Sequence, residues 1–314
     1  MTRVACIGEC MIELKQAERG LYSRGYGGDT LNTAIYLARL GADVDYITAL
    51  GDDPMSDAML AGWAAEGVGT SQVLRLPGKL PGLYMISTNE AGDRRFFHWR
   101  ESSAARSLMD RPETEGILKS LASYPLVYLS AITLSLYNDI GRRRLLAALR
   151  SARDAGARIA FDTNFRLRGW PDLDLARAAY GNAFEVADIV LASTEDLRPL
   201  FDGESDERLL ARISCSEAVL KLAEPASIVR FGATSYALKA EPATKPVVDT
   251  TAAGDSFAAA YLFARMAGAD PVEAARAGHR LASVVVCHHG AIIPRPAMPG
   301  DVAARPAISQ ELSA

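Results

Sequence analysis

Short apolar runs alternate along the chain with longer segments in which apolar residues recur every three to four positions. Apolar runs of about five residues are typical of buried strands in a parallel sheet, and the longer period is that of an amphipathic helix. Strands are predicted at residues 4–8, 44–50, 126–130, 158–162, 188–191 and 217–221, and helices at 31–40, 55–66, 139–155, 254–266 and 271–286. The alternation predicts an α/β fold on a mostly parallel sheet with helices on both faces.

Some segments depart from this alternation. They are residues 9–14, which alternate weakly and are assigned outside the main sheet, a hairpin of 83–87 and 94–100 around a turn at 89–93, and a second hairpin of 226–230 and 235–238. The first hairpin is rich in aromatic residues and has basic ends. Such a hairpin either lies over a polar ligand or packs on the core or a second subunit, and the two interpretations are compatible.

Length, charge and cysteine spacing narrow the class of protein. The 314 residues suffice for one large α/β domain or two small ones, and a net charge of −4 argues against a nucleic-acid partner. The sequence contains no long uncharged stretch, so neither a signal peptide nor a membrane span is predicted. The four cysteines, Cys6, Cys10, Cys215 and Cys287, show no metal-ligand or redox spacing, so they predict reduced thiols in a cytoplasmic enzyme that binds small molecules.

The sequence DTTAAGDSF at residues 249–257 has the composition of an anion cradle. Small residues Ala252, Ala253 and Gly254 leave the backbone accessible, and a helix that begins near Gly254 directs free N–H groups and its positive dipole end into this loop. Asp255 then lies beside the bound anion, where a carboxylate serves as a general base. The alternative is that Asp255 only caps the helix.

This string resembles the second signature of the PfkB/ribokinase family of sugar and nucleoside kinases, DTxGAGD, in which the final Asp is the base. Ala252 replaces the usual glycine, and a methyl group is expected to fit there if the residue has negative φ. Within the family, DTTAAGDSF is most similar to the branch that phosphorylates 2-keto-3-deoxygluconate. The resemblance implies that Asp255 is catalytic and that residues 252–254 form the anion hole.

A second segment, GYGGDTLN at residues 25–32, resembles the first signature of the family, GGxxxN, at the sugar site. Asp29 is interpreted either as the N-cap of the following helix or as a contact to a sugar hydroxyl. Asn32 lies one helical turn further on the same face and reaches the same ligand. The resemblance adds Gly28 to these substrate-binding residues.

Two further strings are similar to the 2-keto-3-deoxygluconate branch, and they carry the candidate carboxylate ligands. LPGLY and the ending WR imply Tyr84 and Arg100 at the sugar, and DTNFRLRGW implies Asn164 and Arg166 there. A planar guanidinium suits a carboxylate, although Arg166 is also interpretable as a surface salt-bridge residue. Arg142, Arg143, Arg144 and Arg150 are assigned to the solvated face of a helix.

The family motifs that surround the nucleotide are only partly present in this sequence. The family's NxxE motif, which organises Mg²⁺ through water, is replaced by Ala192 with Glu195 or Ser193 with Asp196. The resemblance implies ATP contacts from Ser193, Lys221 and Gly254, and Mg²⁺ as a cofactor, with a monovalent cation left open. The family's glycine after Lys221 is missing.

Taken together, the resemblance covers nearly the whole chain and implies a three-layer α/β/α ribokinase-like fold over residues 1–314, with a small β-lid from about 9–26 and 80–101. It implies ATP-dependent phosphorylation of the C-6 hydroxyl of 2-keto-3-deoxy-D-gluconate and a homodimer or higher oligomer that assembles through the lid. Two alternatives stay open: another sugar kinase of the fold, for fructose or ribose, and a catalytically silent sugar-binding regulator.

Overall fold

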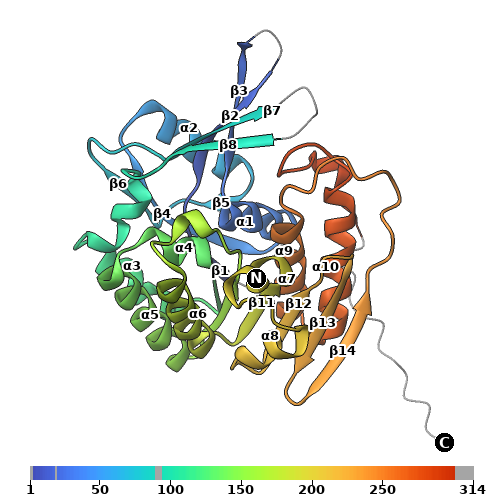
Figure 1. Ribbon diagram of the computed structural model, residues 1–314. Coiled ribbons are helices and arrows are strands. Elements are labelled where there is room, and N and C mark those ends of the chain that lie inside the picture. The colour runs from blue at the N-terminus through green and yellow to red at the C-terminus, as the bar shows by residue number, and fades with distance from the viewer. Residues whose placement is uncertain (1–2, 18–19, 89–93, 301–314) are drawn as a thin grey trace, which may run out of the picture.

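The computed structural model describes residues 3–17, 20–88 and 94–300 (Figure 1). Its main sheet has ten strands, ordered β14-β13-β12-β11-β10-β9-β1-β4-β5, with β6 paired to β4. The strands are β1 (Arg3–Ile7), β4 (Asp43–Gly51), β5 (Val68–Gly69), β6 (Val73–Leu76), β9 (Leu126–Ser130), β10 (Arg158–Asp162), β11 (Ile189–Ser193), β12 (Glu217–Lys221), β13 (Ala226–Phe231) and β14 (Thr234–Lys239). All pairs are parallel except β12–β13 and β13–β14, so the predicted sheet and its closing hairpin are confirmed.

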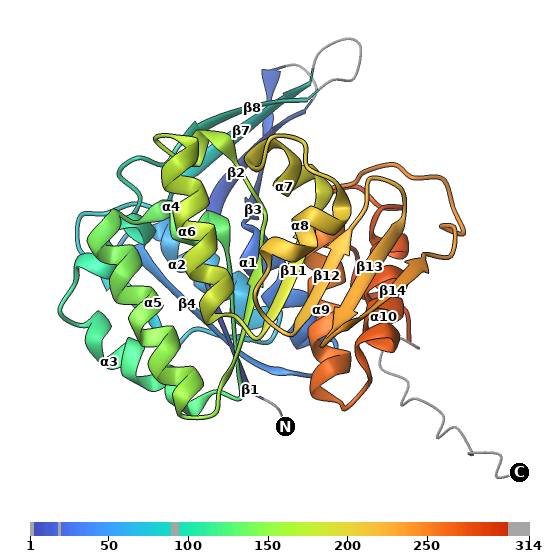
Figure 2. The same cartoon turned by 60° about the horizontal axis from the view of Figure 1, so that its bottom comes forward.

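Helices cover both faces of this sheet, which gives three layers (Figure 2). One face carries α3 (Thr114–Ser120), α4 (Ala131–Leu136), α5 (Asp139–Asp154), α6 (Leu173–Val186), α7 (Thr194–Leu200) and α8 (Asp206–Arg212), and the other α1 (Asp29–Arg39), α2 (Pro54–Ala65), α9 (Ala253–Met266) and α10 (Pro271–Val285). Strand side chains alternate between the two apolar clusters that these helices close, because successive residues of a strand face opposite sides.

A second sheet of four strands, ordered β3-β2-β7-β8, lies at the carboxyl ends of the main strands (Figure 1). It consists of β2 (Met11–Gln16), β3 (Tyr22–Gly27), β7 (Leu83–Thr88) and β8 (Arg94–Trp99). The predicted hairpin is confirmed as the antiparallel pair β7–β8, and residues 9–14 leave the main sheet as predicted. The predicted turn at 89–93 lies outside the described residues.

The chain passes four times between the two sheets, between β1 and β2, β3 and α1, β6 and β7, and after β8. Backbone hydrogen bonds join two of these crossings, because Ala104 N donates to Leu80 O at 2.9 Å. Ile12 N also donates to Gly82 O at 2.8 Å. In the described part of the chain, no helix is long and apolar enough to cross a membrane.

Helix α5 corrects one surface assignment. Arg143 and Arg150 are exposed as predicted, but Arg142 is buried and donates to Tyr137 O at 2.6 Å. Arg144 is half-buried and donates to Met109 O at 2.7 Å. The 3.6-residue period does not reveal such arginines because their charge is satisfied by backbone carbonyls of neighbouring loops.

Candidate active site

The N-terminus of α9 begins at Ala253, and no side chain caps it. Ala253 N donates to Thr250 O at 3.2 Å, so this predicted anion-hole residue is engaged within the loop, and the N–H groups of Gly254 and Asp255 are the first-turn donors for an anion. Ala252, the N-cap, has φ 61° and ψ 17°, so the negative φ under which a methyl group was expected to fit here is not present. A left-handed conformation is unfavourable for a residue with a Cβ, and it bends the chain sharply into the helix. Backbone strain is thus concentrated at the loop that exposes these donors.

The preceding loop is held by Asp249, which is buried. Its Oδ1 accepts from Thr251 N at 3.0 Å and from Thr251 Oγ1 at 2.6 Å, and its Oδ2 accepts from Gly290 N at 3.0 Å. The carboxylate therefore ties the loop to the segment that follows α10. The first acidic residue of the signature is structural, whereas the second faces the site.

Asp255 lies in the first turn of α9 and is half-buried. Asn32 Nδ2, on α1, donates to Asp255 Oδ2 at 2.8 Å. Burial and then the carboxylate of Asp29 raise the pKa of Asp255 to about 8, against the opposing effect of the hydrogen bond from Asn32. Asp255 does not cap its own helix, so it is positioned as a proton acceptor of unusually high basicity.

Asn32 has a second feature that concerns ligands. Its side chain is buried, and its Oδ1 has no hydrogen-bond partner among the described residues. A buried acceptor without a partner is destabilising, and a hydroxyl group of a ligand satisfies it. Asn32 thus presents an unused acceptor next to the Asp255 carboxylate.

Asp29 is not the N-cap of α1, and that alternative is wrong. Gly28 is the N-cap, in extended conformation, and no side chain caps this end. The Asp29 carboxylate instead accepts from Asn164 Nδ2 at 2.8 Å. Asn164 follows β10, so the contact joins the two segments that were predicted separately at the sugar site. A Cβ at Gly28 would lie only 2.3 Å from Glu9 O. The close approach of these two backbone segments therefore requires a glycine at this position.

Lys221, at the end of β12, lies beside the start of α9. A Cβ at Gly254 would be 3.5 Å from Lys221 Nζ, and the ammonium also lies 5.8 Å from the Phe257 ring centroid. Lys221 donates to Asp162 Oδ2 at 3.3 Å. Burial raises the pKa of Asp162, and Lys221 opposes that rise. Lys221 and Gly254 are therefore adjacent, whereas Ser193 caps α7.

The small sheet contributes Tyr84. Its hydroxyl donates to Glu13 Oε2 at 2.5 Å, and a Cβ at Gly27 would lie 1.9 Å from that hydroxyl. Burial and then Glu13 raise the pKa of Tyr84, and the Asp255 carboxylate adds to this rise. The Tyr84 ring therefore lies over the strand end that leads to Gly28, within electrostatic range of Asp255.

Both predicted carboxylate-binding arginines have internal partners. Arg100 pairs with the buried Glu9, and Arg166 Nη1 donates to Phe165 O at 2.7 Å and lies 3.5 Å from Asp196 Oδ1. The Arg166 side chain is 62% exposed, so most of its donors remain accessible. The structure confirms the interpretation of Arg166 as a salt-bridge residue, and its contact with a substrate carboxylate stays a prediction.

Asp196 and Glu195, the two carboxylates predicted to organise Mg²⁺, differ in how accessible their oxygens are. Asp196 is buried and accepts from Thr163 Oγ1 at 3.0 Å, Phe165 N at 2.9 Å and Ser193 Oγ at 2.7 Å, so its oxygens are used within the protein. Glu195 is exposed. Among the described residues, no group of three or more His, Cys, Asp and Glu side chains has the geometry of a metal site.

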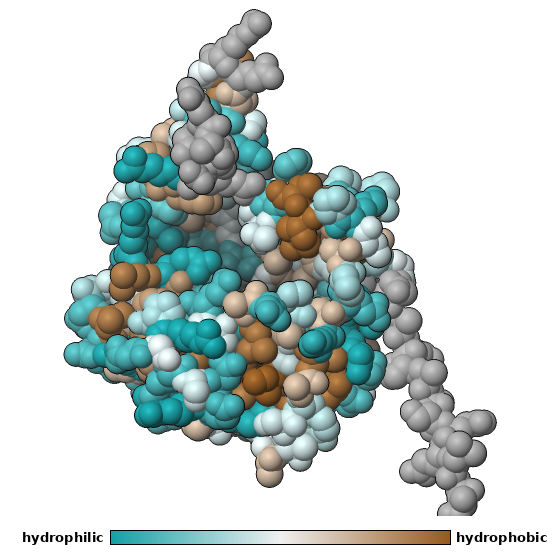
Figure 3. Space-filling view, turned by 45° about the vertical axis from the view of Figure 1, so that its right-hand side comes forward, coloured by the Kyte–Doolittle hydropathy of each residue, from teal (hydrophilic) through white to brown (hydrophobic). Residues whose placement is uncertain are grey.

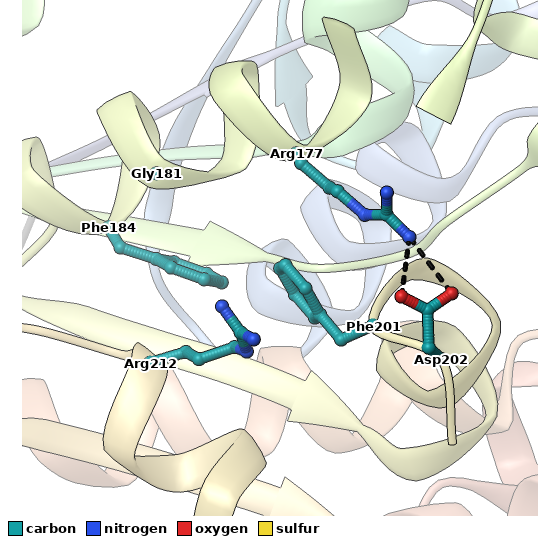
Figure 4. Close-up of a pocket in the computed structure, with 6 residues that line it drawn as sticks. All are labelled: Arg177, Gly181, Phe184, Phe201, Asp202 and Arg212. Atoms are coloured by element: carbon teal, nitrogen blue, oxygen red, sulfur yellow. Dashed lines mark hydrogen bonds and ion pairs between the residues drawn. The ribbon is translucent and has the colours of Figure 1, made fainter. Parts of the chain in front are cut away.

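The surface between the small sheet and the main body is hollowed and largely hydrophilic (Figure 3). A separate cavity of about 370 Å³ lies between α6 and the segment around α7 and α8, where Arg177 pairs with Asp202 and Arg212 lies over Phe201 (Figure 4). Asp202 neutralises the charge of Arg177, and Glu204 neutralises that of Arg212. The charged groups of this cavity are thus internally satisfied, and it contains none of the residues described above.

Sequence reasoning missed Glu9, Glu13 and Asp162. Asp162 ends β10 and Glu9 follows the end of β1, at the edge where open α/β sheets bind ligands, whereas Glu13 lies within β2. The strand-end position was a usable signal for Asp162 and Glu9. The pairing of Glu9 with Arg100 and of Glu13 with Tyr84 gave no signal, since these partners lie more than seventy residues away along the chain.

Residues 1–298 match the pfkB family carbohydrate kinases. The chain is similar to 2-dehydro-3-deoxygluconokinase of Dickeya dadantii (strain 3937), with 43% identity over 94% of this chain and 98% of the relative. It is also similar to 2-dehydro-3-deoxygluconokinase of Escherichia coli (strain K12), with 40% identity over 95% and 99%. The fold is similar to that of a fructokinase with bound ATP from Xylella fastidiosa, with a TM-score of 0.81, 22% identity and 95% of each chain covered.

Proposed function

The chain belongs to the PfkB family of carbohydrate kinases, and on that premise we propose that it transfers the γ-phosphoryl group of ATP to the C-6 hydroxyl of 2-keto-3-deoxy-D-gluconate. The observation that supports this proposal best is the pairing of Asp255 with the uncapped start of α9. Two relatives at 40% identity or more, aligned along nearly their full lengths, supply the substrate.

Asp255 acts as the general base. Its raised pKa makes it a strong enough acceptor for a hydroxyl proton, and the bond from Asn32 fixes the orientation of the carboxylate. The N–H groups of Gly254 and Asp255 stabilise the charge that develops on the transferred phosphoryl group. The hydrogen bonds of Asp249 hold the turn at Ala252, and with it these donors, in place before the substrate arrives.

The groups at the start of α9 fit the phosphates of ATP. The helix N-terminus accepts a phosphate without a side chain in the way, and the Lys221 ammonium beside Gly254 adds a charge-assisted donor. Mg²⁺ neutralises phosphate charge when bound, and the exposed Glu195 is the available carboxylate for holding it through water. The Ser193 hydroxyl is engaged by Asp196, which limits its contact with the nucleotide.

The sugar acid occupies the hollow beneath the small sheet. The unused Oδ1 of Asn32 accepts from a sugar hydroxyl, and Asp29, held by Asn164, accepts from another. Tyr84 covers this region from β7 together with the backbone at Gly28, and the small sheet acts as the lid. Arg166 and Arg100 bind the carboxylate, which distinguishes this substrate from a neutral sugar.

The proposal is tested by ADP release with ATP, Mg²⁺ and a panel of 2-keto-3-deoxygluconate, fructose and ribose. We expect the sugar acid to have the largest kcat/KM. A larger value for fructose or ribose would identify another kinase of this family. Binding of the sugar acid by calorimetry, without ADP release from any substrate, would identify a silent sugar-binding regulator.

We also propose that the chain assembles as a dimer through the small sheet. Large apolar side chains there are exposed: Leu21 (68%), Tyr22 (45%), Phe96 (43%) and Trp99 (57%). Exposed apolar groups gathered on one small element are typical of an interface. Light scattering at micromolar concentration is expected to give twice the monomer mass, and Trp99→Glu to give the monomer. A monomeric wild-type protein would exclude this interface.

A further inference from the structure

Glu9 lies where the chain first leaves the main sheet, between β1 and β2, and its side chain is buried. Burial of a carboxylate is costly unless its oxygens are hydrogen-bonded. Both oxygens have partners here, since Arg100 Nη2 donates to Oε2 and Ser103 Oγ donates to Oε1 at 2.5 Å. Arg100 and Ser103 directly follow β8, so Glu9 joins the first crossing between the sheets to the last one.

A third crossing packs against the same group. A Cβ at Gly82 would lie 3.0 Å from Glu9 Oε1 and 3.2 Å from Arg100 Cβ. A side chain at this position would require Met11, Glu9 or Arg100 to shift by a few tenths of an ångström. Glu9 therefore holds the guanidinium of Arg100, and the backbone at Gly82 packs closely against both side chains.

Arg100 keeps donor capacity beyond this pair. A guanidinium carries five N–H groups, and the contact with Glu9 occupies Nη2. The Nε atom of Arg100 is buried and has no hydrogen-bond partner among the described residues. A buried donor without a partner requires an acceptor, and carboxylate or keto oxygens of a ligand are such acceptors.

We propose that Glu9 is a positioning residue, whose buried carboxylate holds the Arg100 guanidinium so that its remaining donors face the acid end of the substrate. The inference rests on the proposed function. Glu9 itself does not touch the substrate, and it acts through Arg100.

The test is a double-mutant cycle of Glu9→Gln and Arg100→Gln, with KM for 2-keto-3-deoxygluconate and its calorimetric Kd as readouts. A glutamine amide cannot accept from Arg100 and Ser103 with both of its heavy atoms. We expect E9Q to raise both values about tenfold or more and to leave the KM for ATP within about twofold. In the R100Q background, E9Q should raise the KM and the Kd for the sugar acid by less than about twofold.

Glu66→Gln is the matched control. Glu66 forms a bidentate pair with Arg39 at 2.8 and 2.9 Å, away from the site residues described above, so its loss should leave the KM values for both substrates unchanged. If E9Q fails to fold, Ser103→Ala decides the matter. It keeps the ion pair, removes the second anchor of Glu9, and should raise the KM for the sugar acid alone by about two- to fivefold.

Additive effects in the cycle, or equal increases in both KM values, would overturn the inference and make Glu9 a purely structural residue. An unchanged sugar KM in S103A would do the same where E9Q is unfolded. Absence of turnover with sugar-acid binding intact would refute the proposed function only, because the cycle on Kd remains decisive. A wild-type protein that binds no sugar acid would refute both.

Discussion

Replacing Asp255 by Asn should abolish turnover and at the same time stabilise the fold. The amide keeps the shape of the carboxylate and accepts from Asn32, but it cannot take up the hydroxyl proton. Loss of a general base usually lowers the rate by roughly 10²- to 10⁴-fold. The stabilisation follows from the pKa of Asp255, which burial and then the Asp29 carboxylate raise from 3.8 to about 8.

A carboxyl group with a raised pKa binds its proton more tightly in the folded state than in the unfolded one. Its contribution to stability is therefore complete below about pH 4 and is lost as the pH rises towards 8. A difference of about four units between the pKa values of the folded and unfolded states corresponds to at most about 6 kcal/mol of unfolding free energy. Because Asp255 is only half-buried and the Lys221 charge opposes the loss, we expect a gain of about 1–3 kcal/mol for the variant at pH 8.

Thermal unfolding of both proteins between pH 5.5 and pH 8.5 measures this difference. For a chain of this size, a gain of 1 kcal/mol raises Tm by about 2 °C. The advantage of D255N should grow with pH, since only the wild type loses stability over this interval. Asp57→Asn is the control, because Asp57 is exposed in its ion pair with Arg75, and no pH-dependent difference is expected there. A less stable D255N at pH 8, or turnover above a tenth of wild type, would refute the reasoning.

Three further predictions follow from the site. Because the base must be deprotonated, kcat/KM for the sugar acid should rise from pH 6.5 towards pH 8 and level off above it, and a flat profile in this range would contradict the raised pKa of Asp255. Arg166→Ala should raise the KM for 2-keto-3-deoxygluconate about 10- to 100-fold, the loss of a charge-assisted contact of about 1.5–3 kcal/mol, and leave the KM for ATP within about twofold. Arg166→Lys should restore part of this loss, and an equal rise in both KM values would mean that Arg166 supports the fold. Ala252→Gly should relieve left-handed strain and stabilise the protein by about 0.5–1 kcal/mol, measured by urea unfolding, and a destabilised variant would show that the conformation at Ala252 is not strained.

The periodicity of the sequence predicted the sheet and its helices because the main strands are buried on both faces. The strands at 126–130, 158–162 and 217–221 match the prediction residue by residue. The second sheet was harder to predict as a unit, since β2 pairs with β3 and with β7, a strand that lies about seventy residues further along the chain. Alternation indicates that a segment is a strand but carries no information on such a partner.

At the site, the sequence located the individual segments but not the contacts between them. Asp255 and Asn32 were assigned to separate motifs, and their hydrogen bond depends on how α1 packs beside α9. The positive φ of Ala252 went unpredicted because alanine rarely adopts it. The partners of Arg100 and Arg166 could not be predicted either, because a charge in the sequence does not reveal whether another charge has already neutralised it.

The division of the chain into two sheets bears on how its substrate range can change. The groups proposed to bind phosphate, at the start of α9 and at Lys221, belong to the main body, whereas Tyr84 and Arg100 come from the small sheet and its return crossing. If these roles hold, substitutions on β2, β3, β7 and β8 alter the shape and charge above the sugar without moving the proposed general base. A lineage, or a laboratory selection, can explore new acceptors on this sheet while the phosphoryl-transfer chemistry stays intact.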